Sequence, residues 1–244
     1  MSTVLAPPYL SDRARRDWAV LQEETRAPAA FDPADADLLP EPARRWVLHA
    51  IRPGTPLRRT ALLRTHGTIM LGAWRRFTAD QVLRPPDGFV WAARVAWPPV
   101  HGFDRYRAGQ GEMRWRLLNL VSVMSGDGPD ITRSAAGRLA SEFVMTPAAA
   151  LDEGVLWKAI DERHAMARIP VDGKDLEVTI GVGSCGNLEG VSVRRWHDSL
   201  YDTFEVAVDR EATFDGFTIP AEVRASWKSG GEFIRFTVDD ALYR

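Results

Sequence analysis

The sequence is poor in cysteine and has no long apolar run. Cys185 is the one cysteine in the chain, so no internal disulfide forms and the fold does not need an oxidising compartment. No apolar run reaches the length of a membrane-spanning helix. Residues 1–10 are short, apolar and interrupted by proline, and they do not read as a secretory signal. These absences predict a cytoplasmic protein without stable membrane insertion.

Lysine is scarce as well, and the charges nearly cancel. The lysines are Lys158, Lys174 and Lys228, and the formal net charge is −2 at pH 7. Such a balance provides no basic field to attract phosphates, which argues against a nucleic-acid partner. What is abundant is apolar: hydrophobic residues make up 45% of the chain, with nine tryptophans and ten phenylalanines. This composition favours a packed core, β-sheets and apolar pockets.

Helical patterns occupy the N-terminal part and one later segment. Ser11 suits the N-cap of a first helix, in which Trp18 and Leu21 lie three residues apart on one face. A second helix is predicted over residues 42–51, with a proline in its first turn. A third is predicted over residues 130–144, ending before Pro147.

From residue 57 onward the apolar residues alternate with polar ones instead of following a helical period. Alternating stretches cover residues 89–97, 113–117, 176–182, 204–208, 219–227 and 234–238. Alternation gives each strand one dry and one wet face, which antiparallel sheets permit and buried parallel sheets do not. Turn signals such as Asp172-Gly173 and Asp215-Gly216 separate the stretches. We therefore expect about ten or eleven strands.

A sheet of this size has to cover its apolar face, and the helix at 130–144 suits that purpose. The predicted fold is mainly β (α+β): a large curved antiparallel sheet forming a half-open barrel, with an inserted covering helix and N-terminal helices. Residues 1–40 are expected to form an N-terminal helical extension and residues 41–244 the β half-barrel, together one compact unit. A half-open barrel filled partly by a helix leaves a cavity.

Several segments resemble a bacterial family of unknown function that is associated with the half-barrel fold of the LolA-type lipoprotein carriers. In chain order they are residues 88–94 (GFVWAAR), 104–113 (DRYRAGQGEM), 138–142 (RLASE), 155–161 (VLWKAID) and 216–220 (GFTIP). LolA-like proteins hold acyl chains in the concave face of the sheet, under helices. The resemblance covers about residues 40–244 and implies a cavity for a hydrophobic ligand. None of its motifs is catalytic, and the missing secretory signal implies a cytoplasmic relative adapted to another ligand.

Four residues form the candidate acid–base set: Asp104, Tyr106, Glu142 and His101. Alternation places Asp104 and Tyr106 on one strand face, where burial raises the pKa of a carboxyl group and permits proton transfer. The favoured interpretation is instead a buried Asp–Tyr or Asp–Arg hydrogen bond that fixes the sheet, because buried polar groups are usually paired. Glu142 either pairs with Arg138 across one helical turn or faces the cavity as a base or ligand anchor. His101 titrates near neutral pH.

The candidate ligand-binding residues are aromatic side chains on apolar strand faces and one arginine: Trp91, Trp115, Trp157, Trp227 and Arg195. Most of the tryptophans belong to the core, and some line the cavity if it exists. Arg195 lies in the stretch Arg194-Arg195-Trp196-His197, which would bind a carboxylate through a bidentate arginine. The favoured interpretation is instead a charged strand edge that prevents further pairing.

No metal or cofactor is predicted. The five histidines are scattered, without the i, i+4 or Cys-x-x-Cys spacing of a metal site. The glycine-rich residues 181–186 read as a hairpin turn, because no helix with a lysine follows them as in a phosphate loop. Cys185 has no neighbouring histidine in the sequence, and a reactive thiol needs a local positive charge.

Three functions are open at this point. The leading one is the binding of a hydrophobic small molecule or acyl chain in the concave cavity. The second is a cofactor-independent cyclase, isomerase or dehydratase of bacterial secondary metabolism, since orienting a flexible substrate can contribute about 7–11 kcal/mol. The third is a structural or partner-binding domain. A homodimer is possible, with its contacts in the first forty residues.

Overall fold

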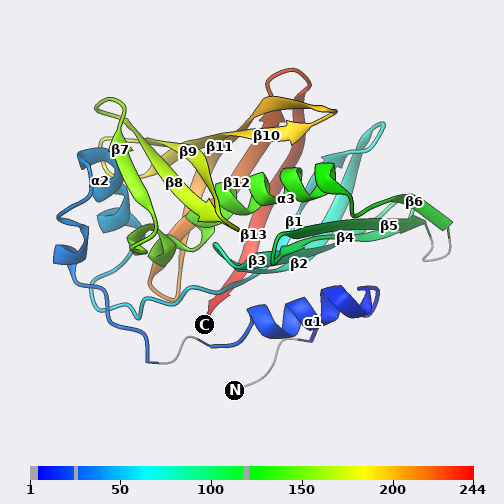
Figure 1. Ribbon diagram of the computed structural model, residues 1–244, viewed down its shortest axis with the longest axis horizontal. Coiled ribbons are helices and arrows are strands. Elements are labelled where there is room, and N and C mark those ends of the chain that lie inside the picture. Colours follow the sequence, from blue (N-terminus) through cyan, green and yellow to red (C-terminus); the bar gives the residue numbers. More distant parts are fainter. Residues whose placement is uncertain (1–4, 25–26, 118–120) are drawn as a thin grey trace.

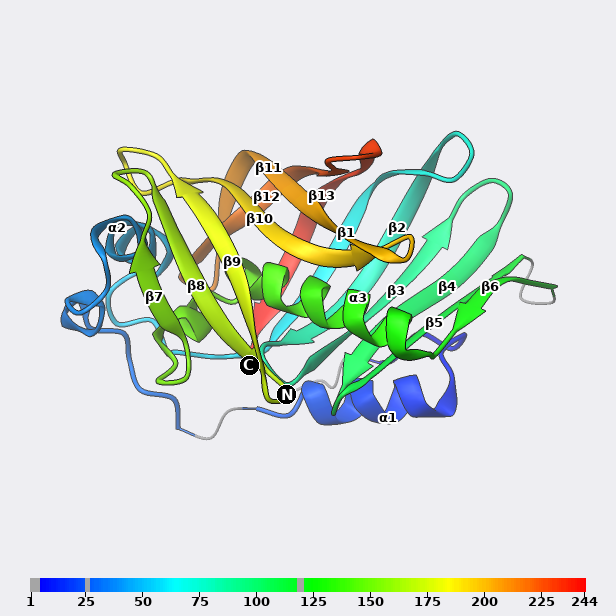
Figure 2. The same ribbon diagram turned by 45° about the horizontal axis from the view of Figure 1, so that its top comes forward.

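The computed structural model describes residues 5–24, 27–117 and 121–244 (Figure 1). Residues 1–4, which belong to the stretch considered above as a signal, lie outside the described residues. Within the described part, thirteen strands form one antiparallel sheet that curves around a helix (Figures 1 and 2). None of the helices described is long and apolar enough to cross a membrane.

The chain builds the sheet in two halves. Three helical elements come first: α1 (Asp12–Leu21), η1 (Pro33–Ala36) and α2 (Glu41–Ala50). The first half follows as β1 (Ala61–Met70), β2 (Trp74–Arg84), β3 (Gly88–Val95), β4 (Val100–Arg107), β5 (Gln110–Leu117) and β6 (Val121–Gly126). The chain then crosses over through α3 (Pro129–Ser141), η2 (Glu142–Met145) and η3 (Pro147–Leu151). The second half consists of β7 (Leu156–Ala159), β8 (His164–Val171), β9 (Lys174–Val182), β10 (Leu188–His197), β11 (Leu200–Phe214), β12 (Phe217–Trp227) and β13 (Gly231–Tyr243).

The strand order leaves the sheet open. It runs β6-β5-β4-β3-β2-β1-β13-β12-β11-β10-β9-β8-β7, so the halves join through β1 and β13 while β6 and β7 are the edges. The crossover through α3 connects these edges and lies along the concave face (Figure 2). The expected half-open barrel with a covering helix and N-terminal helices is confirmed. The described residues form more strands than expected, because short strands such as β7, most of whose residues are exposed, show no alternation.

The helices begin and end close to their expected positions. Helix α2 spans Glu41–Ala50, and α3 starts at Pro129 and ends at Ser141, after which the chain tightens into the 3-10 turn η2. The division into residues 1–40 and 41–244 stays a prediction.

Helix α1 covers part of the convex face. The Ser11 hydroxyl accepts a hydrogen bond from the Ala14 backbone N–H at 3.2 Å, which caps the helix. Trp18 of α1 belongs to a buried cluster with Val90 and Ala92 of β3. Strand β3 is therefore apolar on both faces, because one face lines the concave core and the other meets α1.

One end of the half-barrel is fastened by hydrogen bonds between its two halves. The Asp172 carboxylate, in the turn after β8, accepts from the Tyr106 hydroxyl of β4 at 2.6 Å. The same carboxylate oxygen accepts from the Gly109 backbone N–H at 2.8 Å. Burial and the negative charge of Asp172 raise the pKa of Tyr106 above its ordinary value. Tyr106 therefore braces the wall between the two halves.

Candidate functional site

A cavity of about 590 Å³ lies between α3 and the concave face of the sheet. This volume is within the range of pockets that hold small organic ligands. Its wall is mostly apolar and includes Phe77, Trp91, Trp115, Phe204, Trp227 and Phe236. Leu71 and Met124 also line it and are 42% and 45% exposed, so the cavity opens to solvent beside them.

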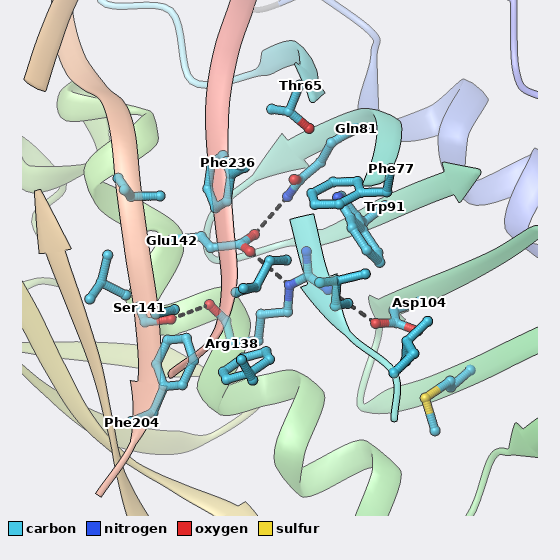
Figure 3. A pocket seen from close by; sticks show the side chains of 18 of the residues that line it. Thr65, Phe77, Gln81, Trp91, Asp104, Arg138, Ser141, Glu142, Phe204 and Phe236 are labelled. Carbon is cyan, nitrogen blue, oxygen red and sulfur yellow. Dashed lines mark hydrogen bonds and ion pairs between the residues drawn. The ribbon is translucent and has the colours of Figure 1, made fainter. Parts of the chain in front are cut away.

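A small polar network crosses this apolar wall (Figure 3). Arg138 of α3 donates from Nε to Glu142 Oε1 at 2.7 Å and from Nη1 to Asp104 Oδ2 at 3.1 Å. The second oxygen of each carboxylate is also bonded. Trp115 Nε1 donates to Asp104 Oδ1 at 3.1 Å, and Gln81 Nε2 donates to Glu142 Oε2 at 2.6 Å. The network ties α3 and η2 to β2, β4 and β5.

The apolar surroundings shift the pKa of two groups in the cavity. Burial raises the pKa of Asp104, although the Arg138 charge and the Trp115 hydrogen bond oppose the rise. Burial and the neighbouring Arg138 charge lower the pKa of Arg195 to about 9, which leaves it protonated at neutral pH. The cavity lining therefore carries three arginines, Arg75, Arg138 and Arg195, and two carboxyl groups, those of Asp104 and Glu142.

Arg195 enters the cavity from β10 and is only 8% exposed. Its guanidinium lies over the rings of Phe204 and Trp227, with centroid distances of 4.4 Å and 5.1 Å. Its Nε donates to the Ser134 carbonyl oxygen of α3 at 3.3 Å. The helix makes room for it at Gly137, where a Cβ atom would lie 2.7 Å from Arg195 Cγ.

Residues 194–197 form the end of β10 that is paired on one side. β10 pairs with β11 from Gly190 to His197 but with β9 only from Leu188 to Val193, so among the described residues 194–197 have no strand partner on the β9 side. Arg195 continues the inward-facing register of Val191 and Val193, which are both buried, whereas Arg194 is exposed. The exposed Arg194 fits the strand-edge interpretation, whereas the buried Arg195 lines the cavity, and its binding of a carboxylate stays a prediction.

The structure brings two of the four acid–base candidates together. Asp104 and Glu142 both line the cavity and share Arg138. Tyr106 is on the same strand face as Asp104, but its hydroxyl is bonded to Asp172 outside the cavity lining. His101 alternates onto the convex face, where it stacks on Tyr9 with ring centroids 5.2 Å apart.

Four of the five candidate ligand-binding residues line the cavity: Trp91, Trp115, Trp227 and Arg195. Trp157 does not. It packs between Trp46 and Phe143, and its Nε1 donates to the Ala150 carbonyl oxygen at 3.0 Å. Trp157 thus belongs to the core beneath α2.

The sequence patterns do not single out two further polar residues of the cavity, Gln81 and Arg75. A signal for Gln81 exists, because it shares the register of the buried Phe77, Ala79 and Leu83 on β2. A polar residue at an inward-facing position needs an inward-facing partner, which Glu142 supplies. Arg75 precedes these residues in the same register, and its Nε has no hydrogen-bond partner in the described part of the chain.

The described residues contain no group of three His, Cys, Asp or Glu side chains arranged to hold a metal ion. The glycine-rich residues 181–186 lead from the end of β9 into the turn before β10. Cys185 is exposed in this turn.

The match to a protein family agrees with the sequence resemblance to a family of unknown function. Residues 29–237 match a family described as "Family of unknown function (DUF6544)". Similar solved structures include an outer membrane lipoprotein-sorting protein domain from Vibrio parahaemolyticus, with 8% identity, a TM-score of 0.45 and coverage of 76% of this chain and 85% of that chain. A DUF1329 family protein from Desulfovibrio piger is 14% identical, with a TM-score of 0.39 and coverage of 87% of this chain and 94% of that chain. A LolA superfamily protein from Nitrosomonas europaea is 9% identical, with a TM-score of 0.46 and coverage of 83% of this chain and 92% of that chain. No curated protein matches the chain.

Proposed function

We propose that this chain, which belongs to the DUF6544 family of unknown function, binds a hydrophobic small molecule or acyl chain in the cavity beneath α3. The observation that carries the proposal is the apolar cavity of about 590 Å³ with its opening at Leu71 and Met124. Each methylene group that leaves water contributes about 0.8 kcal/mol. An acyl chain therefore offsets the several kcal/mol that association costs. A cytoplasmic location remains a prediction.

A neutral fluorescent probe, N-phenyl-1-naphthylamine, tests this function. We expect it to bind the wild type and to be displaced by dodecanol, because both molecules are apolar and uncharged. Ala225 of β12 lines the cavity and is 3% exposed. Ala225→Phe is expected to weaken probe binding by about tenfold or more, since the added ring occupies ligand space.

The matched control is Ser226→Phe, which adds the same ring at the next residue of β12, outside the cavity lining. Circular dichroism verifies that both variants are folded. A wild type that binds neither probe nor dodecanol contradicts the proposed function. If both variants bind the probe as tightly as the wild type does, the proposed function is also contradicted.

One observation favours a second candidate, a cofactor-independent enzyme that uses acid–base chemistry. Asp104 faces the cavity, and burial raises its pKa. A carboxyl group with a raised pKa in an apolar pocket is suited to proton transfer. However, both oxygens of Asp104 and both oxygens of Glu142 are already bonded. Because all four oxygens already accept hydrogen bonds, we place ligand binding before proton transfer.

Asp104→Asn is expected to change how the free energy of unfolding depends on pH. In the unfolded chain the pKa of the Asp104 carboxyl group is about 3.9, whereas in the folded protein its pKa is higher. The stability contributed by the protonated Asp104 is therefore present below about pH 4 and lost as the pH rises through the raised pKa. Urea unfolding at a series of pH values should show the wild type losing stability relative to the variant above about pH 4. If the unfolding free energies of the wild type and the variant change with pH in parallel, the pKa of Asp104 is not raised. The observation that favours the enzyme is then lost.

A further inference from the structure

The charged groups of the cavity are paired unevenly. Arg138 contacts both carboxylates, those of Asp104 and Glu142. Arg195 has no carboxylate within ion-pair distance, 4.0 Å, in the described part of the chain. Arg195 is 8% exposed, and the charges of Asp104 and Glu142 act on it only from beyond that distance. Arg75 of the same lining has no ion pair among the described residues either, but it is less buried. A buried cation without a counter-ion in contact is unfavourable, and an anion brought by a ligand relieves this cost.

The fold holds Arg195 in a fixed position. Its guanidinium lies over Phe204 and Trp227, and Nε is bonded to the Ser134 carbonyl oxygen. Gly137 admits its stem, although glycine inside a helix is less stable than alanine. The close approach of Arg195 thus requires a residue that weakens α3.

The free part of Arg195 has the geometry of a carboxylate receptor. Nη1 and Nη2 have no hydrogen-bond partner among the described residues. Two neighbouring N–H groups of a guanidinium match the two oxygens of a carboxylate. A dianionic phosphate matches less well, because Asp104 and Glu142 line the same cavity and repel additional negative charge.

We propose that the ligand is an amphipathic monocarboxylic acid of the fatty-acid class, whose carboxylate pairs with Arg195 while its apolar part fills the cavity. This inference rests on the proposed function, because it requires an apolar ligand between α3 and the sheet. It adds the chemical class of the ligand and the residue that recognises its polar end.

Displacement of N-phenyl-1-naphthylamine by laurate and by methyl laurate tests the inference, since the two ligands share a chain and differ in charge. We expect the wild type to bind laurate about tenfold more tightly than methyl laurate, the effect of a charged hydrogen-bonded pair. In Arg195→Met this preference, the ratio of the two affinities measured in the same variant, should fall to about twofold or less. Arg194→Met is the matched control, because Arg194 is the exposed neighbour on the same strand, and it should behave as the wild type.

The outcomes separate the inference from the proposed function. If the wild type binds neither the probe nor laurate, the proposed function fails. If it binds the probe but does not prefer laurate, the inference is overturned and the proposed function stands. A laurate preference that survives in Arg195→Met and disappears in Arg75→Met also overturns the inference, because the carboxylate then pairs with Arg75. Tighter binding of dodecyl phosphate than of laurate overturns the monocarboxylate class.

Discussion

Replacing Arg138 by leucine is expected to lower the free energy of unfolding by about 2–4 kcal/mol, slightly less than the cost of breaking a fully buried ion pair. The variant leaves Asp104 and Glu142, whose side chains are 26% and 23% exposed, without their shared cation in an apolar cavity. The Trp115 and Gln81 donors remain, but neutral donors do not balance two negative charges. Urea unfolding monitored by circular dichroism at pH 7 measures the loss.

The origin of this loss is tested by adding Asp104→Asn and Glu142→Gln to Arg138→Leu. The triple variant is expected to be more stable than Arg138→Leu alone, because amides need no counter-ion. Arg133→Leu is the control on the same helix. Arg133 pairs with the half-exposed Asp130 at the surface, so its loss should cost about 1 kcal/mol or less. A loss for Arg138→Leu no larger than for Arg133→Leu would show that cavity water solvates the carboxylates.

Much of the sheet is predictable from the sequence, because alternation reports local burial. The stretches at 113–117, 176–182, 204–208, 219–227 and 234–238 all lie within strands. The stretch at 89–97 is correct until Val95, whereas Trp97 lies beyond β3 and is 72% exposed. Alternation shows which residues share a face but not which strands pair. The junction of β1 with β13 joins residues far apart in the chain, so no local pattern predicts it.

The site is less predictable than the sheet, because it depends on what faces each side chain from another element. Asp104 and Tyr106 have the same alternation, yet the first reaches the cavity and the second reaches Asp172 across the fastened end of the half-barrel. Arg195 does carry a signal, since it is a charged residue in the register of buried valines. That signal becomes informative only once α3 is known to lie against this end of β10.

Replacing Arg105 by leucine is expected to release α1 from the convex face. Arg105 of β4 is 1% exposed and pairs with Asp17 of α1, and its Nε lies 3.3 Å from Glu112 Oε2 of β5. Removing it leaves two carboxylates, 9% and 12% exposed, without their shared cation, at a cost of about 3–5 kcal/mol. When α1 detaches, Asp17 returns to water. We therefore expect the lost stability to appear as local opening of α1, which occurs before the whole chain unfolds.

Trypsin measures this opening, because α1 contains Arg13, Arg15 and Arg16. Cleavage in α1 of Arg105→Leu should be about tenfold faster than in the wild type, or more. Arg107→Leu is the matched control, since Arg107 pairs with the same Asp17 but is 37% exposed, and its cleavage rate should change by about twofold or less.

Equal cleavage of the two variants would mean that the apolar contacts of α1, such as those of Trp18, hold it without the buried ion pair. The family match begins at residue 29, so α1 lies outside the matched segment, and it packs on the face of the sheet opposite the cavity. Arg105→Leu should therefore keep the wild-type affinity for N-phenyl-1-naphthylamine even while trypsin removes α1. A parallel loss of probe binding would show that residues 1–40 and the half-barrel are one cooperative unit, whose concave face depends on the helix packed against its convex face.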